Sequence, residues 1–253
     1  MHSLAVSSLV FALIFVSALI GMVIRRASPD DHFSSEAKDT VRLAVGLVVT
    51  MTGLVLGMLV SSSKNFYDSE KTQVAEMSSQ IILLNDLLQT YGPETAQTRV
   101  MARQSVATAV DRIWPLEKSR AFQLRPETAD QEFYRALEGL TPKNDSQAAI
   151  KAQLMSLTVS LKKTYWMMYL QSVQTSMPIP LLVVVTSWLM AIFVSFGVFA
   201  PRNSTVILTL IVCALSVSAA ILIIMSMYLP FSGILKISPV AVHDALGQMT
   251  KAQ

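Results

Sequence analysis

The chain has few of the residues on which catalysis, metal binding and disulfide cross-linking depend. It contains one cysteine, Cys213, and three histidines, His2, His32 and His243, which lie far apart in the sequence. A single cysteine excludes an internal disulfide framework and a thiolate metal cluster. The isolated histidines do not have the His-x-x-x-His or Glu-x-x-His spacing of a metal site. We therefore expect no bound metal and no cofactor.

Motifs for enzymes and for nucleic-acid binding are also missing. Glycine occurs only nine times, and there is no glycine-rich phosphate loop, nucleophile elbow or kinase signature. The net charge is +3, but the basic residues of the polar middle are spread out and balanced by acids, as on a solvated helical surface. The sequence predicts that the protein is not an enzyme and has no nucleic-acid partner.

Charge is absent from four long apolar stretches, namely residues 4–24, 43–63, 179–200 and 205–229. Each is long enough to cross a hydrocarbon layer of roughly 30 Å, which takes about 20 residues. The first stretch has no basic segment before it and is followed by Arg25 and Arg26, so we expect a retained helix rather than a signal peptide. The fold class predicted is an all-α membrane protein with four transmembrane helices.

The spans divide the chain into four parts. Residues 1–63 form the first transmembrane hairpin, 64–178 a helical extramembrane domain, 179–229 the second hairpin, and 230–253 a C-terminal turn and short helix. Four spans place both termini and the middle domain on one side of the membrane. Basic residues near the span ends are shared almost evenly between the two sides, so charge does not decide the orientation. Spans without charge argue against a coupled transporter or a voltage sensor.

The polar middle has a helical pattern. No proline occurs between residues 43 and 91, so the second span is expected to continue as one long helix. An apolar stripe follows that extension at steps of three and four residues: Val74, Met77, Ile81, Leu84 and Leu88. The sequence Tyr91-Gly92-Pro93-Glu94 predicts a helix stop and a new start. Further helices are expected over about 94–114, 126–139 and 145–177.

Two short patterns remain open at this point. Tyr165, Trp166 and Tyr169 lie at helical spacing and form either part of the helix-packing core or an interfacial aromatic belt. Pro230, Phe231, Ser232 and Gly233 predict a turn after the last span. A short helix after this turn would place Val242, Ala245 and Leu246 on one side.

The second span has one face made of small residues. These residues recur at steps of three and four and include a GxxxG pair: Gly46, Thr50, Gly53, Gly57 and Ser61. Small residues let helices approach closely in lipid, where no hydrophobic effect drives their association. The face therefore either packs against a neighbouring helix or forms a narrow, weakly polar lining around the axis of an oligomer.

Several segments resemble the bestrophin-like membrane proteins of bacteria. They are Gly53–Gly57 with Tyr67, Asp68 and Glu76, then Tyr91–Glu94 with Arg99 and Ile113–Pro115, then Pro201–Val206 and Ala214–Val217, and finally Pro230–Gly233 with Ile237, Ser238, Ala245 and Leu246. The resemblance covers most of the chain and is most specific at its C-terminal segment. One position departs from the pattern, since the family usually has an acidic pair just before Pro230, where this chain has Ser226 and Tyr228.

The resemblance implies a fold and suggests a function. Bestrophins are anion channels with four spans, a large cytosolic helical region between spans two and three, and a pentameric pore lined by span two. By analogy we expect a homo-oligomer, a pentamer, in the cell (inner) membrane, with the helical domain and both termini in the cytoplasm. The leading hypothesis is a passive anion channel whose pore is lined by Gly46, Thr50, Gly53, Gly57 and Ser61. The alternative is a membrane-anchored sensor or scaffold whose helical domain binds a partner without conduction.

Overall fold

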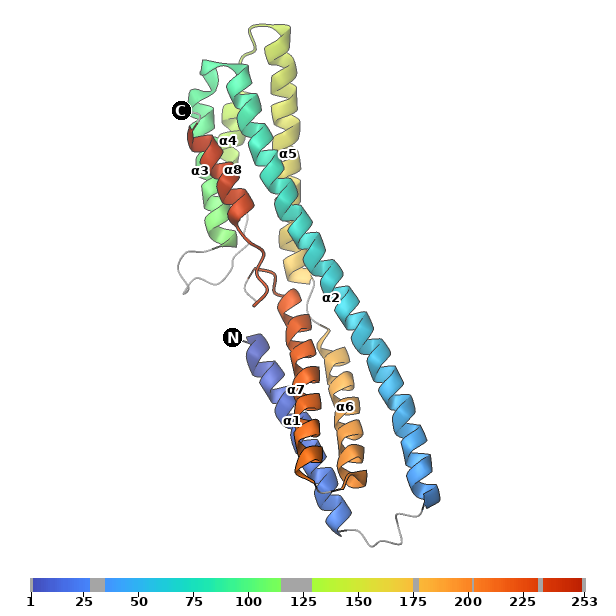
Figure 1. Ribbon diagram of the computed structural model, residues 1–253. Helices are drawn as coiled ribbons and strands as arrows, with labels where there is room; N and C mark the ends of the chain where they lie inside the picture. Colours follow the sequence, from blue (N-terminus) through green and yellow to red (C-terminus); the bar gives the residue numbers. More distant parts are fainter. Residues whose placement is uncertain are drawn as a thin grey trace. The chain divides into compact units, whose positions relative to one another are not determined.

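The computed structural model describes residues 2–27, 35–114, 129–174, 178–201, 203–231 and 234–251. These residues form only helices, with no strand among them (Figure 1). In chain order the helices are α1 (His2–Ala27), α2 (Ser35–Tyr91), the 3-10 helix η2 (Pro93–Thr95), α3 (Ala96–Ile113), α4 (Ala129–Glu138), α5 (Asp145–Gln174), α6 (Ile179–Phe199), α7 (Ser204–Met227) and α8 (Val240–Lys251). The described chain divides into two compact units, one built mainly from residues 1–66 and 177–229, the other mainly from 67–176 and 236–253.

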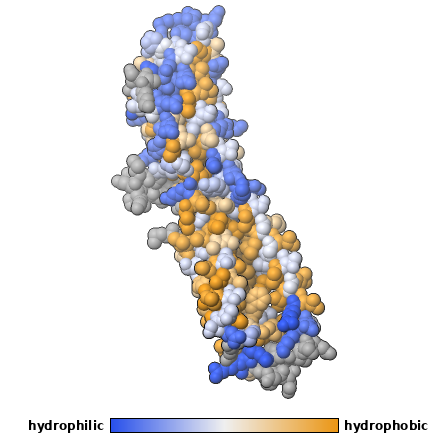
Figure 2. All heavy atoms as spheres, viewed as in Figure 1, coloured by the Kyte–Doolittle hydropathy of each residue, from blue (hydrophilic) through white to orange (hydrophobic). Residues whose placement is uncertain are grey.

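The first unit contains the apolar parts of four helices. α1, α2, α6 and α7 are each long and apolar enough to cross a membrane. On the face shown in Figure 2, the surface of these helices is mainly apolar, as expected for contact with lipid acyl chains. The prediction of an all-helical fold with four membrane-spanning helices is confirmed.

α1 and α6 cross at a pair of glycines. A Cβ atom added to Gly21 would lie 2.1 Å from the carbonyl oxygen of Val194, and one added to Gly197 would lie 2.1 Å from that of Ala18. Only glycine fits where two helix backbones approach this closely, which is how small residues promote helix packing in lipid. This crossing positions α1 against α6, and the sequence analysis did not single it out.

α2 is a single helix of 57 residues. The prediction that the second span continues without a break to Tyr91 is confirmed. All five residues of the predicted apolar stripe are at most 4% exposed and belong to the core of the second unit: Val74, Met77, Ile81, Leu84 and Leu88. Packing of this stripe explains why a stretch with many polar residues remains helical, since buried apolar faces stabilise helices more than propensity does.

The helix ends where the sequence predicts. Gly92 has a φ of +130°, a backbone conformation that side chains with a Cβ rarely adopt, and Pro93 begins the 3-10 helix. The hydroxyl of Thr95 donates to the carbonyl oxygen of Leu88 at 2.6 Å and so satisfies one acceptor at the end of α2.

The second unit is completed by α3, α4, α5 and α8. α3 begins and ends close to the predicted positions, α4 ends close to its predicted end, and α5 begins at the predicted residue, Asp145. The predicted start of the 126–139 helix and the predicted end of the 145–177 helix lie outside the described residues. Tyr165 and Tyr169 pack against the core of this unit, while Trp166 remains 37% exposed and contacts Tyr169 edge to face. On α8, Val242 and Ala245 are fully buried, as the predicted face requires.

Candidate functional site

The small-residue face of α2 is open in the single chain. All five of its residues are exposed: Gly46, Thr50, Gly53, Gly57 and Ser61. A Cβ atom added to any of the three glycines would meet no described heavy atom within 4 Å. None of the described helices of this chain therefore packs tightly on the face.

α2 uses a different face to pack within the first unit. Thr52, Leu59 and Ser63 are at most 4% exposed, and four further residues are partly buried beside them: Val45, Val48, Val55 and Leu56. At 100° per residue, the small-residue face points roughly 140° away from this packed face. The two faces therefore lie on nearly opposite sides of the helix.

The chemistry of the open face is weakly polar. The hydroxyl of Thr50 donates to the carbonyl oxygen of Gly46 at 2.9 Å, and no ionisable side chain occurs between residues 46 and 61. At the helical spacing of the face, the next charged positions are cationic, Arg42 before it and Lys64 after it. Arg42 pairs with Asp39 at 3.8 Å, and both side chains are largely exposed.

Ser226 and Tyr228, at the end of α7, have separate structural roles. The hydroxyl oxygens of Tyr228 and Ser62 lie 3.2 Å apart, and the ring of Tyr228 stacks on Phe66 with centroids 5.8 Å apart. Ser226 is buried, and its hydroxyl donates to the carbonyl oxygen of Leu222 at 2.7 Å. Tyr228 thus connects the end of α7 to α2 just beyond the small-residue face.

The first two residues of the predicted turn after the last span contribute to packing in the second unit. Pro230 and Phe231 are buried, and the ring of Trp114 meets Phe231 edge to face at 5.6 Å. The indole nitrogen of Trp114 donates to the carbonyl oxygen of Ile237 at 3.1 Å. The other two residues of the predicted turn, 232 and 233, lie outside the described residues.

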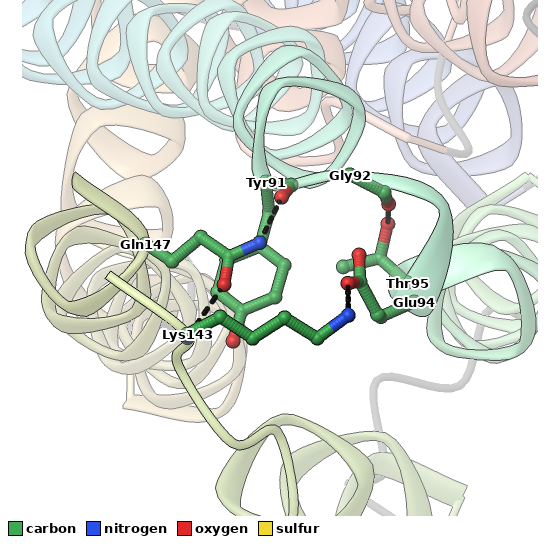
Figure 3. A network of polar contacts seen from close by, with 6 residues as sticks. All are labelled: Tyr91, Gly92, Glu94, Thr95, Lys143 and Gln147. Carbon is green, nitrogen blue, oxygen red and sulfur yellow. Dashed lines mark hydrogen bonds and ion pairs between the residues drawn. The ribbon is translucent and has the colours of Figure 1, made fainter. Parts of the chain in front are cut away.

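A polar network fixes the turn after α2 to the start of α5 (Figure 3). The side-chain amide of Gln147 donates to the carbonyl oxygen of Tyr91 at 2.9 Å and accepts from the backbone nitrogen of Lys143 at 2.7 Å. The ammonium group of Lys143 also pairs with Glu94. This hydrogen bond lowers the pKa of Glu94 and raises that of Lys143. The pair of Lys143 and Glu94 is exposed, and the network explains the geometry of the turn rather than a reaction.

A cavity of about 500 Å³ lies within the second unit, bordered by α2, α3, α4 and α5. Its apolar lining includes Met77, Ile81, Leu84, Val106, Val110, Phe133, Val159 and Leu161. Its charged lining residues are Arg112, Arg135, Lys162 and Glu138, and hydroxyl groups come from Ser105, Thr108, Tyr134, Thr158 and Tyr165. The volume is within the usual range of small-molecule pockets, roughly 300–1,000 Å³.

Glu70 is a buried carboxylate on α2, beyond the apolar part of the helix. It is fully buried, and neither carboxylate oxygen has a hydrogen-bond partner among the described residues. Desolvation raises its pKa from 4.5 to about 7. Among the described residues, no group of three His, Cys, Asp or Glu side chains is arranged to hold a metal ion.

The fold and these features define a multi-pass helical membrane protein with a separate helical unit. The bestrophin-like domain matches residues 11–242, which is most of the chain, and the protein therefore belongs to the bestrophin-like family. No curated protein matches the chain. The resemblance found in the sequence is thus confirmed at the level of the family.

The sequence analysis missed Glu70, the crossing at Gly21 and the cavity. Glu70 could have been found, because it lies four residues before Val74 and occupies the next position of the apolar stripe. Gly21 and Gly197 lie on different helices, and the cavity depends on how four helices pack. No pattern within one segment indicates either of them.

Proposed function

We propose that the chain assembles into a homo-oligomer around α2 and forms a passive channel for ions, preferentially anions. In this proposal Gly46, Thr50, Gly53, Gly57 and Ser61 line the pore. The activity proposed is conduction rather than catalysis.

The observation that carries the proposal is the open small-residue face, which points away from the face that α2 packs within its own unit. In a ring of copies, such a face would give each subunit a narrow surface of backbone and hydroxyl groups toward the axis. Both ends of the face carry a cationic residue, and although Arg42 is paired with Asp39, Lys64 at the other end favours anions over cations at that entrance.

Family membership supports the proposal by analogy. Bestrophins are pentameric anion channels whose second span lines the pore, and this chain has its small-residue face on the corresponding helix. A shared fold alone does not establish function, so the analogy supports conduction without demonstrating it. By the same analogy, we propose that the protein lies in the cell membrane with the helical unit and both termini in the cytoplasm.

Currents across planar bilayers test conduction directly. Purified protein should give ohmic currents whose reversal potential, in a chloride gradient, moves toward the equilibrium potential of the anion. Lys64→Glu should reduce the anion preference, whereas Lys163→Glu, an exposed change on α5, should leave it unchanged. Absence of current at all pH values and Ca²⁺ concentrations tested would refute the proposal.

Chemical accessibility tests which face of α2 lines the pore. The exposed Cys213 is first replaced by serine, and Thr50→Cys is then compared with Met51→Cys on the neighbouring side of the same helix. A charged, water-soluble thiol reagent should block currents through the Thr50→Cys protein and leave those of the Met51→Cys protein unaffected. Equal responses of the two variants would contradict the assignment of the face.

A second candidate function is a membrane-anchored sensor or scaffold, and the cavity in the helical unit is the observation that favours it. The stoichiometry of the solubilised particle separates the two. A channel along α2 requires a ring of subunits, whereas an anchor can be a monomer or dimer. A monomer or dimer without current would favour the sensor.

A further inference from the structure

We propose that the cavity of the helical unit binds a single-chain amphiphile with an anionic headgroup, of the class of a fatty carboxylate. The site is formed by α2, α3, α4 and α5 within one compact unit. Binding here is independent of conduction, because no residue of the small-residue face contributes to the cavity.

The apolar side chains that line the cavity favour an apolar ligand. α2 contributes Met77, Ile81 and Leu84, each at most 4% exposed, and α3 and α4 contribute the buried Val110 and Phe133. Water against an apolar wall finds few hydrogen-bond partners. An acyl chain gains dispersion contacts with these side chains and needs no polar partners.

The charges of the cavity select the headgroup. Among the described residues, three positive side chains line it, Arg112, Arg135 and Lys162, against one negative side chain, Glu138. Arg135 and Lys162 are exposed, whereas Phe133 and Leu84 of the apolar lining are buried. This division between exposed cations and a buried apolar wall matches a ligand with a charged head and an apolar tail. The hydroxyl group of Tyr134 is a further donor for a carboxylate.

Two other ligand classes fit these residues less well. The positive excess disfavours a cationic amphiphile, and the extent of the apolar wall disfavours a small hydrophilic anion such as phosphate. The described lining residues include no cysteine and no histidine, so they offer no thiol or imidazole for chemistry on a bound molecule.

Photo-crosslinking tests the site in the full-length protein, held in amphipol so that detergent does not compete. The probe is laurate that carries a photoreactive diazirine on its chain, and the crosslinked residues are mapped by peptide mass spectrometry. We expect crosslinks to residues of α3, α4 and α5 that line the cavity, with laurate competing better than dodecanol, which has the same chain and a neutral head. Octanoate and palmitate define the preferred chain length.

Charge variants test the headgroup with a matched control. Arg135→Glu combined with Lys162→Glu should weaken laurate binding roughly tenfold, as expected when two exposed charge contacts are reversed. Lys163→Glu changes a neighbouring exposed lysine that does not line the cavity and should bind laurate like the wild type. All of these positions are exposed, so the variants should fold.

Several outcomes would overturn the proposal. Equal competition by dodecanol and laurate would show that the headgroup is not recognised. Crosslinks confined to α1, α6 or α7 would indicate nonspecific insertion beside the spans, and absence of crosslinking would show that the cavity is closed to acyl chains. Unchanged affinity in the double variant would exclude Arg135 and Lys162 as headgroup ligands.

Discussion

Glu70 is the residue whose burial has the clearest thermodynamic consequence. Its raised pKa means that the folded protein holds a proton that the unfolded chain releases near its ordinary pKa of 4.5. Stability is therefore lost as the pH rises from about 5 to about 7, and the loss persists above that range. Glu70 occupies a position of the apolar stripe of α2. An apolar side chain there would bury no charge and would not make stability depend on pH.

We predict that Glu70→Gln stabilises the protein at alkaline pH. The neutral amide avoids the burial of a charge, and the expected gain at about pH 8.5 is roughly 1–3 kcal/mol, against less than about 1 kcal/mol at about pH 5. Thermal unfolding of the solubilised protein at the two pH values measures the difference. Glu76→Gln, an exposed change on the same helix, is the control and should have little effect at either pH. A gain for Glu70→Gln that does not depend on pH would contradict the assignment.

Gly21 allows a second prediction for a single residue. Gly21→Ala should destabilise the protein by about 1–3 kcal/mol or more, because the added methyl group would meet the backbone of α6 at 2.1 Å and force the helices apart. Gly247→Ala, in α8, is the matched control: its new methyl group meets no described atom within 4 Å, and the loss of glycine from a helix should be neutral or stabilising. Comparison of the unfolding temperatures of the two variants provides the test. Similar effects of both changes would argue against the close crossing.

At the scale of elements, α2 is where the sequence was most informative. The stripe from Val74 to Leu88 has a strict helical period, and the break at Gly92 and Pro93 uses residues with special backbone preferences, so both could be predicted locally. The crossing of α1 with α6 could not be predicted locally, because it depends on Gly21 and Gly197, which lie far apart in the sequence and meet only after folding. The cavity was inaccessible for the same reason, since it arises from the packing of four helices and not from a repeat within one.

α2 also has the clearest test of assembly. Gly53→Leu should leave the fold of the single chain intact, because an added Cβ has no described neighbour within 4 Å, but it should block close approach of a second copy at the GxxxG pair. We expect the particle mass, measured by mass photometry, to fall while the helix content by circular dichroism stays constant. Met58→Leu, at a residue 71% exposed on the same helix, is the control and should retain the full mass. Unchanged mass for Gly53→Leu would show that the face is not an interface.

At the scale of the whole molecule, the four apolar helices define a membrane protein. Its orientation does not follow from charge, because the basic residues near the span ends are shared almost evenly between the two sides of the membrane. We predict that the helical unit lies in the cytoplasm. In a Cys213→Ser background, Ser146→Cys, exposed on α5, should react with a membrane-impermeant maleimide only after the membrane is permeabilised. Asp39→Cys, exposed near the start of α2, should react from outside in intact cells.

The two cysteine positions control for each other. Reaction at Asp39→Cys demonstrates that the reagent reaches the outer face of the membrane, so that protection at Ser146→Cys reports topology rather than failure of the reagent. The reverse labelling pattern would place the helical unit outside the cell. The cavity would then meet external amphiphiles rather than those of the cytoplasm.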